Sequence, residues 1–548
     1  MTQQLPLRHK LGLLTCGAAA LASGIAGCGG FAGGAAAPES VAASAAPGYP
    51  AQYPQPAPPA EAALLDEGEP NTESYDQVVE NAFLAVTKNP LSTFSVDVDT
   101  ASYANTRRFL AQGKLPPKDA VRIEELINYF DYDYPDPSGA EPFSVTTEVS
   151  VAPWKPEHRL VHIGLQGKRL AKKDMPPRNL VFLLDVSGSM GEPNKLPLLK
   201  RSLKELTETL TQKDRIAIVV YAGASGQVLP STSATQKTQI LGALERLEAG
   251  GSTNGGEGIE LAYEIARRHF RKDGINRVIL ATDGDFNVGV SSPAALSRLI
   301  EEKRKTGVFL TVLGFGMGNY KDSTLEKLAD KGNGNYAYID DIAEARKVLV
   351  QQAGATLVTI AKDVKIQVEF NPKWASSYRL IGYENRLLAN EDFNNDKKDA
   401  GDIGAGHTVT ALYEVVPVGA PSPAGSVDAL KYQKPAAASD AQASDELMTV
   451  KLRYKAPQGD TSKLISEVVK ARSTELSKTS NTFRYAASVA AFGMLLRDSA
   501  HAGNADFGMV KALAEGAESR DPHGYWREYV GMVRQAERLK KPVPALAK

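Results

Sequence analysis

Five oxygen-bearing side chains in the middle of this chain have the types and spacing of a metal site. They are Asp185, Ser187, Ser189, Thr253 and Asp283. The first three directly follow an apolar run at 180–184, and the last follows a second run at 278–281. Ligands bind beyond the carboxyl ends of parallel strands, so we expect these oxygens to converge at one edge of a sheet. Carboxylates and hydroxyl groups, without a cysteine or histidine, favour a hard divalent cation.

The elements that must position these residues alternate between strands and helices. Apolar runs predict strands at 180–184, 216–221, 278–281, 309–313 and 336–339. Amphipathic segments predict helices at 196–210, 237–247, 258–270, 294–305, 323–331 and 342–352. This alternation predicts an α/β domain with a doubly wound, mainly parallel sheet that helices cover on both faces.

Strand patterns flank this α/β region on both sides. Residues 143–165 alternate or run apolar, and strand patterns return between 360 and 457. Because an isolated hairpin is only marginally stable, we predict that both sets pair into one β-sandwich with the α/β domain inserted between its strands. The alternative is two separate small sheets. Residues 470–540 have a helical pattern, which predicts a C-terminal helical domain.

The five predicted ligand positions resemble those of a known module, the von Willebrand factor type A (VWA) domain with its metal-ion-dependent adhesion site. Asp185, Ser187 and Ser189 match its DxSxS element, Thr253 its distal threonine, and Asp283 its distal aspartate. The resemblance implies a VWA/Rossmann-like fold and a bound Mg²⁺, or Mn²⁺ or Ca²⁺. It also implies that an Asp or Glu carboxylate of a protein partner replaces a water on the ion. It implies binding and not turnover, so we expect no enzymatic activity.

The flanks of the VWA region resemble a family of bacterial VWA lipoproteins. Residues 89–103 and 121–130 look like the segment that precedes the VWA domain in that family. Residues 483–498 look like the family's C-terminal domain, whose function is not established. The resemblance therefore covers nearly all of the expected mature chain.

The N-terminus has the order of a secretory signal: basic residues, an apolar stretch, and small residues before Cys28. The small residues resemble a bacterial lipobox, which implies cleavage before Cys28 and lipid on that residue. The alternative is an ordinary signal peptide with an incidental cysteine. Gly29 is not aspartate, and by resemblance to the sorting rule of enteric bacteria this favours the outer membrane. Residues 29–73 are rich in Ala, Pro, Gly and Ser and predict a disordered tether.

These observations predict seven segments. They are a lipoprotein signal peptide (1–27), a tether (28–74), an N-terminal VWA-associated segment (75–140), the first part of the sandwich (141–172), the VWA domain (178–356), the second part of the sandwich (358–460) with a disordered loop (417–445), and a C-terminal helical domain (465–548).

Motifs of common enzymes are weak or missing in the sequence. No Gly-x-x-x-x-Gly-Lys-Ser/Thr loop occurs, and Asn319 replaces the last glycine of a dinucleotide-binding pattern that starts at Gly314. Asp97 and Asp99 are similar to a phosphatase aspartate pair, but Ala101 stands where that motif has threonine, which favours a structural turn. His158 and His162 lie four apart on a predicted strand, about 13 Å from end to end, which is too far to share one ion.

Composition and charge exclude further classes. The net charge of −1 offers no basic surplus for nucleic acid, and the two cysteines, Cys16 and Cys28, exclude a cysteine metal site in the body of the chain. Our leading hypothesis is a lipid-anchored envelope protein that binds a protein partner through the metal site, with no small-molecule substrate. The alternatives are an envelope scaffold whose metal is mainly stabilising, and an Mg²⁺-dependent hydrolase.

Overall fold

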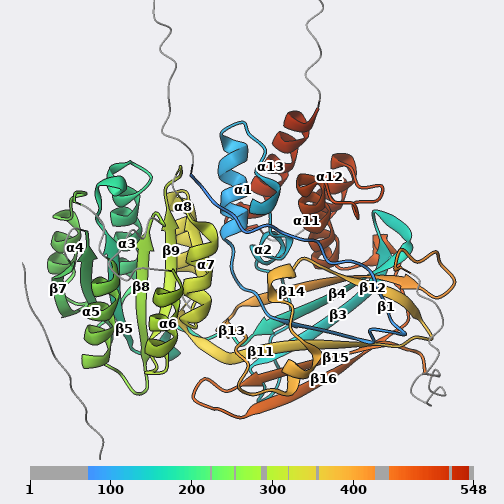
Figure 1. Ribbon diagram of the computed structural model, residues 1–548, viewed down its shortest axis with the longest axis horizontal. Coiled ribbons are helices and arrows are strands. Elements are labelled where there is room, and N and C mark those ends of the chain that lie inside the picture. Colours follow the sequence, from blue (N-terminus) through green and yellow to red (C-terminus); the bar gives the residue numbers. More distant parts are fainter. Residues whose placement is uncertain are drawn as a thin grey trace, which may run out of the picture. The chain divides into compact units, whose positions relative to one another are not determined.

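Three sheets and two groups of helices make up the part of the chain that the computed structural model describes (Figure 1). The described residues are 72–222, 225–251, 255–284, 293–318, 320–352, 357–425, 444–517 and 521–541. They belong to one unit of the chain, Glu67–Lys548. The predicted signal peptide, Cys28, nearly all of the tether and residues 426–443 of the predicted loop lie outside them.

The central α/β domain has a six-stranded sheet with the strand order β10-β9-β8-β5-β6-β7. Its strands are β5 (Arg178–Asp185), β6 (Arg215–Tyr221), β7 (Ser225–Ser233), β8 (Ile275–Thr282), β9 (Phe309–Phe315) and β10 (Tyr336–Ile339). All neighbours are parallel except β7, which runs antiparallel to β6. The prediction of a doubly wound, mainly parallel sheet is confirmed.

Helices cover both faces of this sheet, because successive side chains of a buried strand point to opposite sides. On β5, Leu180, Phe182 and Leu184 join one hydrophobic core, and Val181 and Leu183 join the other. The helices are α3 (Leu196–Thr209), α4 (Lys237–Glu245), α5 (Gly255–Arg268), α6 (Pro293–Arg304), α7 (Asp322–Lys331) and α8 (Ile342–Arg346), which continues into a π-helical turn (Lys347–Gln351).

The flanking strands form one β-sandwich, so the predicted insertion of the α/β domain is confirmed. One sheet has the order β1-β12-β14-β4-β3, and the other joins β13, β11, β15 and β16, with β2 also paired to β11. The strands are β1 (Leu84–Ala85), β2 (Leu91–Ser95), β3 (Phe143–Ala152), β4 (Lys155–Gly167), β11 (Thr359–Phe370), β12 (Ala375–Ile381), β13 (Gly401–Gly404), β14 (Thr408–Pro417), β15 (Glu446–Lys455) and β16 (Ser462–Lys470). One core holds side chains of both sheets, such as Val161 and Ile163 with Ile366 and Val368.

The remaining helices come from both ends of the described chain and share one core. They are α1 (Ala101–Ala111), α2 (Ile123–Asn128), α11 (Asn481–Arg497), α12 (Phe507–Glu515) and α13 (Tyr525–Lys540). Phe483, Tyr485 and Phe492 of α11 are buried there beside Ile127 and Phe130. The N-terminal segment therefore has no separate core of its own among the described residues.

Five strands depart from the sequence-based expectation. Residues 462–470 form strand β16, although part of this segment was expected to begin the helical domain. Its apolar residues Leu464, Ile465, Val468 and Val469 are spaced as in a helix. The segment is nevertheless a strand because it pairs with β15. Strands β1, β2, β7 and β13 were not anticipated. Strand β7 contains Pro230, which weakens a strand pattern and is tolerated at the edge of a sheet.

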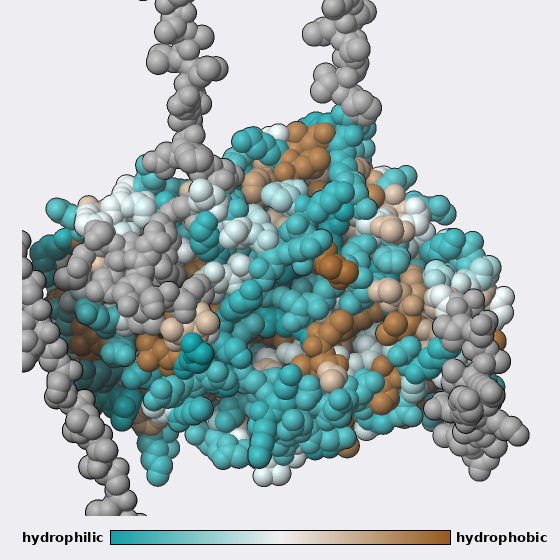
Figure 2. Space-filling model, in the orientation of Figure 1, coloured by the Kyte–Doolittle hydropathy of each residue, from teal (hydrophilic) through white to brown (hydrophobic). Residues whose placement is uncertain are grey.

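Most of the face drawn in Figure 2 is hydrophilic, and its hydrophobic residues lie in separate areas. The exposed large hydrophobic side chains are Val79, Leu84, Leu115, Phe270, Met317, Trp374, Leu387, Val418, Leu464 and Val468. Of the helices within the described ranges, none combines the length and the apolar character that crossing a bilayer requires.

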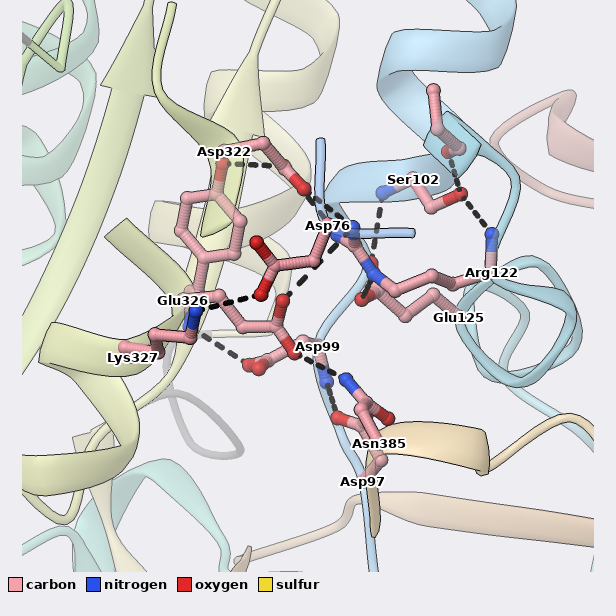
Figure 3. Close-up of polar contacts among 12 residues, drawn as sticks. Asp76, Asp97, Asp99, Ser102, Arg122, Glu125, Asp322, Glu326, Lys327 and Asn385 are labelled. Carbon is pink, nitrogen blue, oxygen red and sulfur yellow. Dashed lines mark hydrogen bonds and ion pairs between the residues drawn. The ribbon is translucent and has the colours of Figure 1, made fainter. Parts of the chain in front are cut away.

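A cluster of buried charges joins the N-terminal segment, the α/β domain and the sandwich (Figure 3). The members of this buried ion cluster are Asp97, Asp99, Arg122, Glu125, Asp322, Glu326, Asp330 and Arg386. Arg122, just before α2, pairs with Glu125 and with Asp322 at the start of α7. Its side chain thereby links α2 directly to the α/β domain.

Arg386 makes the corresponding link from the sandwich. Its guanidinium lies 3.1 Å from Asp97, 3.0 Å from Asp99 and 2.6 Å from Asp330 of α7. Asp99 also accepts a hydrogen bond of 2.8 Å from the backbone N–H of Tyr336 in β10. Breaking a buried ion pair leaves an uncompensated charge in a medium of low polarity, so the loss exceeds that of a surface pair.

We predict that Arg386→Met lowers the free energy of unfolding by about 3–5 kcal/mol, because it leaves the facing carboxylates buried without their cation. Chemical denaturation of the purified protein measures this loss. Lys478→Met is the control, since Lys478 pairs with Glu475 at the surface and its side chain is 70% exposed. A loss for Arg386→Met no larger than that of the control would contradict the assignment.

Glu124 of α2 is a buried carboxylate beside this cluster. Within the described residues its Oε2 has no hydrogen-bond partner, and the same holds for Oε2 of Glu384. Burial raises the pKa of Glu124 from its ordinary 4.5 to about 8, and the charge of Glu384 adds to the rise. Between these pH values the folded state holds a proton that the unfolded state releases, so stability falls as the pH rises.

We therefore predict that Glu124→Gln flattens this decline, because glutamine keeps the neutral form at every pH. The melting temperature of the variant should stay close to that of the wild type at about pH 5 and exceed it increasingly towards about pH 8. Melting curves recorded across this range test the prediction, with Glu157→Gln as the exposed control. Parallel pH profiles for Glu124→Gln and the wild type would show that it is wrong.

Candidate metal-binding site

The loop after β5 carries the first three predicted ligands. Asp185 is the last residue of β5 and is completely buried. Its Oδ1 accepts a hydrogen bond of 2.9 Å from the backbone N–H of Ser187, which fixes the turn. The hydroxyl groups of Ser187 and Ser189 lie 3.0 Å apart. Ser187 is 3% exposed, whereas Ser189 is exposed, so the pair reaches from the buried carboxylate to the surface.

The end of β8 brings the fifth predicted ligand, Asp283, to the same edge. Strands β5 and β8 are parallel neighbours, with Leu184 opposite Ala281, so Asp185 and Thr282 follow side by side. The hydroxyl of Thr282 donates a 2.9 Å hydrogen bond to Oδ2 of Asp185. Asp283, the next residue, is completely buried. The predicted convergence of the Asp185 loop and the Asp283 turn is therefore present.

The loop that contains Thr253 also reaches this edge in its described part. The backbone N–H of Gly250 donates to the carbonyl of Val186 at 2.8 Å, and that of Gly188 donates to the carbonyl of Gly251 at 3.1 Å. Thr253 itself lies outside the described residues. Its assignment as a ligand stays a prediction.

The electrostatics of the edge favour a cation. Burial raises the pKa of Asp185 to about 6, and the negative charge of Asp283 raises it further, while hydrogen bonds from Ser187 and Thr282 oppose the rise. Two carboxylates that destabilise each other in a buried position are stabilised when a positive charge lies between them.

One residue of this edge was not anticipated from the sequence. Lys195, the residue before α3, is buried, and its Nζ lies 3.0 Å from Oδ2 of Asp283. Its methylene groups pass over Gly316 at the end of β9, where an added Cβ would come within 2.3 Å of Cε. The sequence gives no sign of this role, because a lysine ten positions after Asp185 indicates nothing until the fold is known.

The donor set fits a hard divalent ion. Carboxylate and hydroxyl oxygens are the ligands that Mg²⁺, Mn²⁺ and Ca²⁺ prefer, and here they lie around the end of β5. Among the described residues, no three His, Cys, Asp or Glu side chains gather as a metal-holding group. The edge offers two carboxylates, and its other oxygens belong to hydroxyl groups.

The aspartate pair and the histidine pair that resemble parts of enzyme motifs have structural roles. Asp97 and Asp99 belong to the buried ion cluster, which agrees with the predicted structural role of this turn. His158 pairs with Glu414 at 2.6 Å, and His162 contacts the hydroxyl of Tyr134 at 2.8 Å. Both histidines lie on β4, so the predicted strand is confirmed.

Comparison with known proteins agrees with this architecture. Three family models match: von Willebrand factor at residues 69–162, von Willebrand factor type A domain at 179–352, and Uncharacterized protein YfbK, C-terminal, at 355–539. VWA domains mediate protein–protein interactions and commonly bind a divalent metal ion.

Curated relatives and solved structures extend the comparison. Uncharacterized protein YfbK of Escherichia coli is 44% identical over 475 residues, which are 85% of this chain and 82% of that protein. Inter-alpha-trypsin inhibitor heavy chain H4 of Homo sapiens is 27% identical over 28% of this chain and 17% of its own length. The solved von Willebrand factor type A from Catenulispora acidiphila is 19% identical, with a TM-score of 0.41 over 76% of this chain and 93% of that one.

The identity to YfbK extends over most of both chains. The match to the YfbK C-terminal family model covers the second part of the sandwich and the C-terminal helices. The chain therefore belongs to the YfbK family of VWA-domain proteins.

Proposed function

We propose that this chain is a lipid-anchored protein of the bacterial cell envelope that binds a protein partner through a metal ion on its VWA domain. The observation that carries the proposal is the meeting of Asp185, Ser187, Ser189 and Asp283 at the carboxyl edge of one sheet. The match of residues 179–352 to the VWA model supports the same class of function.

Asp185, Ser187, Ser189, Asp283 and, by prediction, Thr253 would hold the ion. A bound Mg²⁺, or Mn²⁺ or Ca²⁺, supplies an electrophilic position that accepts a carboxylate oxygen of a partner. The buried carboxylates fix the inner side of the site, whereas exposed Ser189 lies on the side that a partner can reach. The contact gains strength when the partner excludes water from this edge.

The proposed anchor rests on the sequence around Cys28. Lipid chains contribute about 0.8 kcal/mol for each buried CH₂ group, so more than one chain holds a protein firmly at a membrane. The described chain begins beside the binding edge: the backbone N–H of Thr72 donates to the carbonyl of Gly318 at 2.6 Å. Ser74 then forms a bridge to Lys321, and the backbone of Lys321 lies against Gly284, the residue after Asp283. The tether would therefore join the body next to the site.

Retention of a partner should depend on the metal ion. We predict that the immobilised protein retains an envelope protein from a cell-envelope extract in Mg²⁺, loses it in EDTA, and recovers it when excess Mg²⁺ is restored. Asp185→Asn should retain nothing under any of these conditions, because the amide cannot balance the charge of the ion.

Asp174→Asn, a substitution at an exposed position outside the site, is the matched control and should behave as the wild type. Partner retention that survives EDTA and Asp185→Asn would contradict metal-dependent binding and favour the alternative of a structural scaffold.

The lipid anchor predicts a different outcome for each cysteine. Labelled palmitate should be incorporated into the wild type and into Cys16→Ser, but not into Cys28→Ser, when each is expressed in bacteria. Cys28→Ser should also leave the membrane fraction on centrifugation. Equal labelling of Cys28→Ser and the wild type would show that the anchor is wrong.

A further inference from the structure

The inference concerns Lys195, and it rests on the metal site of the proposed function. The ammonium of Lys195 lies 3.0 Å from Oδ2 of Asp283, one of the two carboxylates at the binding edge. Asp283 is completely buried and the side chain of Lys195 is 7% exposed, so water screens this pair only weakly. A positive charge of the chain itself thus stands beside one of the two carboxylates that would hold a divalent ion.

The fold holds this lysine firmly. Its backbone N–H donates to the carbonyl of Glu192 at 3.0 Å, and its carbonyl accepts from the N–H of Leu199 in the first turn of α3 at 2.8 Å. From this fixed start the side chain runs across the end of β9 to Asp283 at the end of β8. Its end point is therefore set by three neighbouring elements of the α/β domain.

Gly316 makes the passage possible. A Cβ at this position would lie 2.3 Å from Cε, 2.8 Å from Cδ and 2.7 Å from Cγ of Lys195, distances that real atoms do not adopt. Its backbone has φ +79°, a conformation that favours glycine. The hydroxyl of Tyr338 donates to the carbonyl of Gly316 and holds that segment in place. The space that the methylene groups of Lys195 occupy at the sheet edge therefore depends on glycine at position 316.

We propose that Lys195 sets the charge balance of the metal site, so that it weakens binding of the ion and strengthens binding of the partner's carboxylate. A divalent ion alone would cancel the charges of Asp185 and Asp283. With the ammonium of Lys195 also present, the loaded site keeps one net positive charge. The ammonium repels the incoming cation, and the excess charge attracts an acidic ligand.

The two effects have opposite signs, which separates this role from simple support of the fold. If Lys195 only stabilised the loop, its removal would lower the affinity for the ion and the affinity for the acidic ligand together. Removal of its charge alone should instead raise the affinity for the ion and lower the affinity for the acidic ligand. The metal ion and the acidic partner would then assist each other's binding, since each compensates the charge that the other leaves in excess.

The test is a calorimetric titration of the full chain with Mn²⁺, once in chloride and once in acetate at equal ionic strength. Lys195→Met keeps most of the stem over Gly316 and removes the charge. It should bind Mn²⁺ at least about 10-fold more tightly than the wild type in chloride, because a positive charge that repels the ion over a few ångströms is removed. Acetate should tighten Mn²⁺ binding in the wild type and do so less in the variant.

Lys204→Met, which removes an exposed lysine from α3, the helix that follows Lys195, is the matched control and should bind Mn²⁺ as the wild type does. Melting curves confirm folding, and Lys195→Gln replaces the methionine variant if that one fails to fold. Mn²⁺ affinity that is unchanged or lower in a folded Lys195 variant would overturn this inference and leave the metal site intact. A folded wild type that takes up no Mn²⁺ would overturn the proposed function as well.

Discussion

The candidate metal site of this protein depends on one geometric constraint, which is that β5 and β8 are parallel neighbours and end together. The register places Leu184 opposite Ala281, so the next residues on both strands, Asp185 and Thr282, share a hydrogen bond of 2.9 Å. Asp283 then follows at the same edge. Two carboxylates that are about a hundred positions apart in the chain meet because parallel pairing brings the carboxyl ends of strands to one side.

Two groups of buried carboxylates in this molecule are stabilised in different ways. In the buried ion cluster, Arg122 and Arg386 supply positive charge in fixed fork geometry, and their pairs link three parts of the chain. Arginine suits this role because its planar group contacts two carboxylates at once and stays charged. At the candidate metal site the cation of the chain is a lysine, Lys195, whose single ammonium pairs with Asp283, while Asp185 accepts hydrogen bonds from Ser187 and Thr282. The two groups thus differ in how completely the chain compensates the charge of its own carboxylates.

The segments before and after the VWA domain do not fold as independent additions. Helix α1 contributes Ala101 and Ala104 to a core of the α/β sheet. Helix α2 packs into the same core as α11, α12 and α13, together with residues of the sandwich such as Leu160 and Leu412. The VWA domain is therefore held by the rest of the chain through apolar contacts, through the buried ion cluster, and through the ion pair of Arg107 in α1 with Glu344 in α8.

The sequence by itself determined the α/β domain, its insertion in the sandwich and the helical C-terminal region, because long buried strands and helices have strong hydrophobic periodicity. It also predicted that Asp185, Ser187, Ser189 and Asp283 meet at one sheet edge, since strand ends are visible as apolar runs followed by polar residues. Only the tertiary structure decided that 462–470 is a strand, because its side chains are spaced as in a helix and pairing with β15 overrides that local pattern. Likewise, only the tertiary structure placed Lys195 against Asp283, because the path of its side chain depends on Gly316, which lies 121 positions further along the chain.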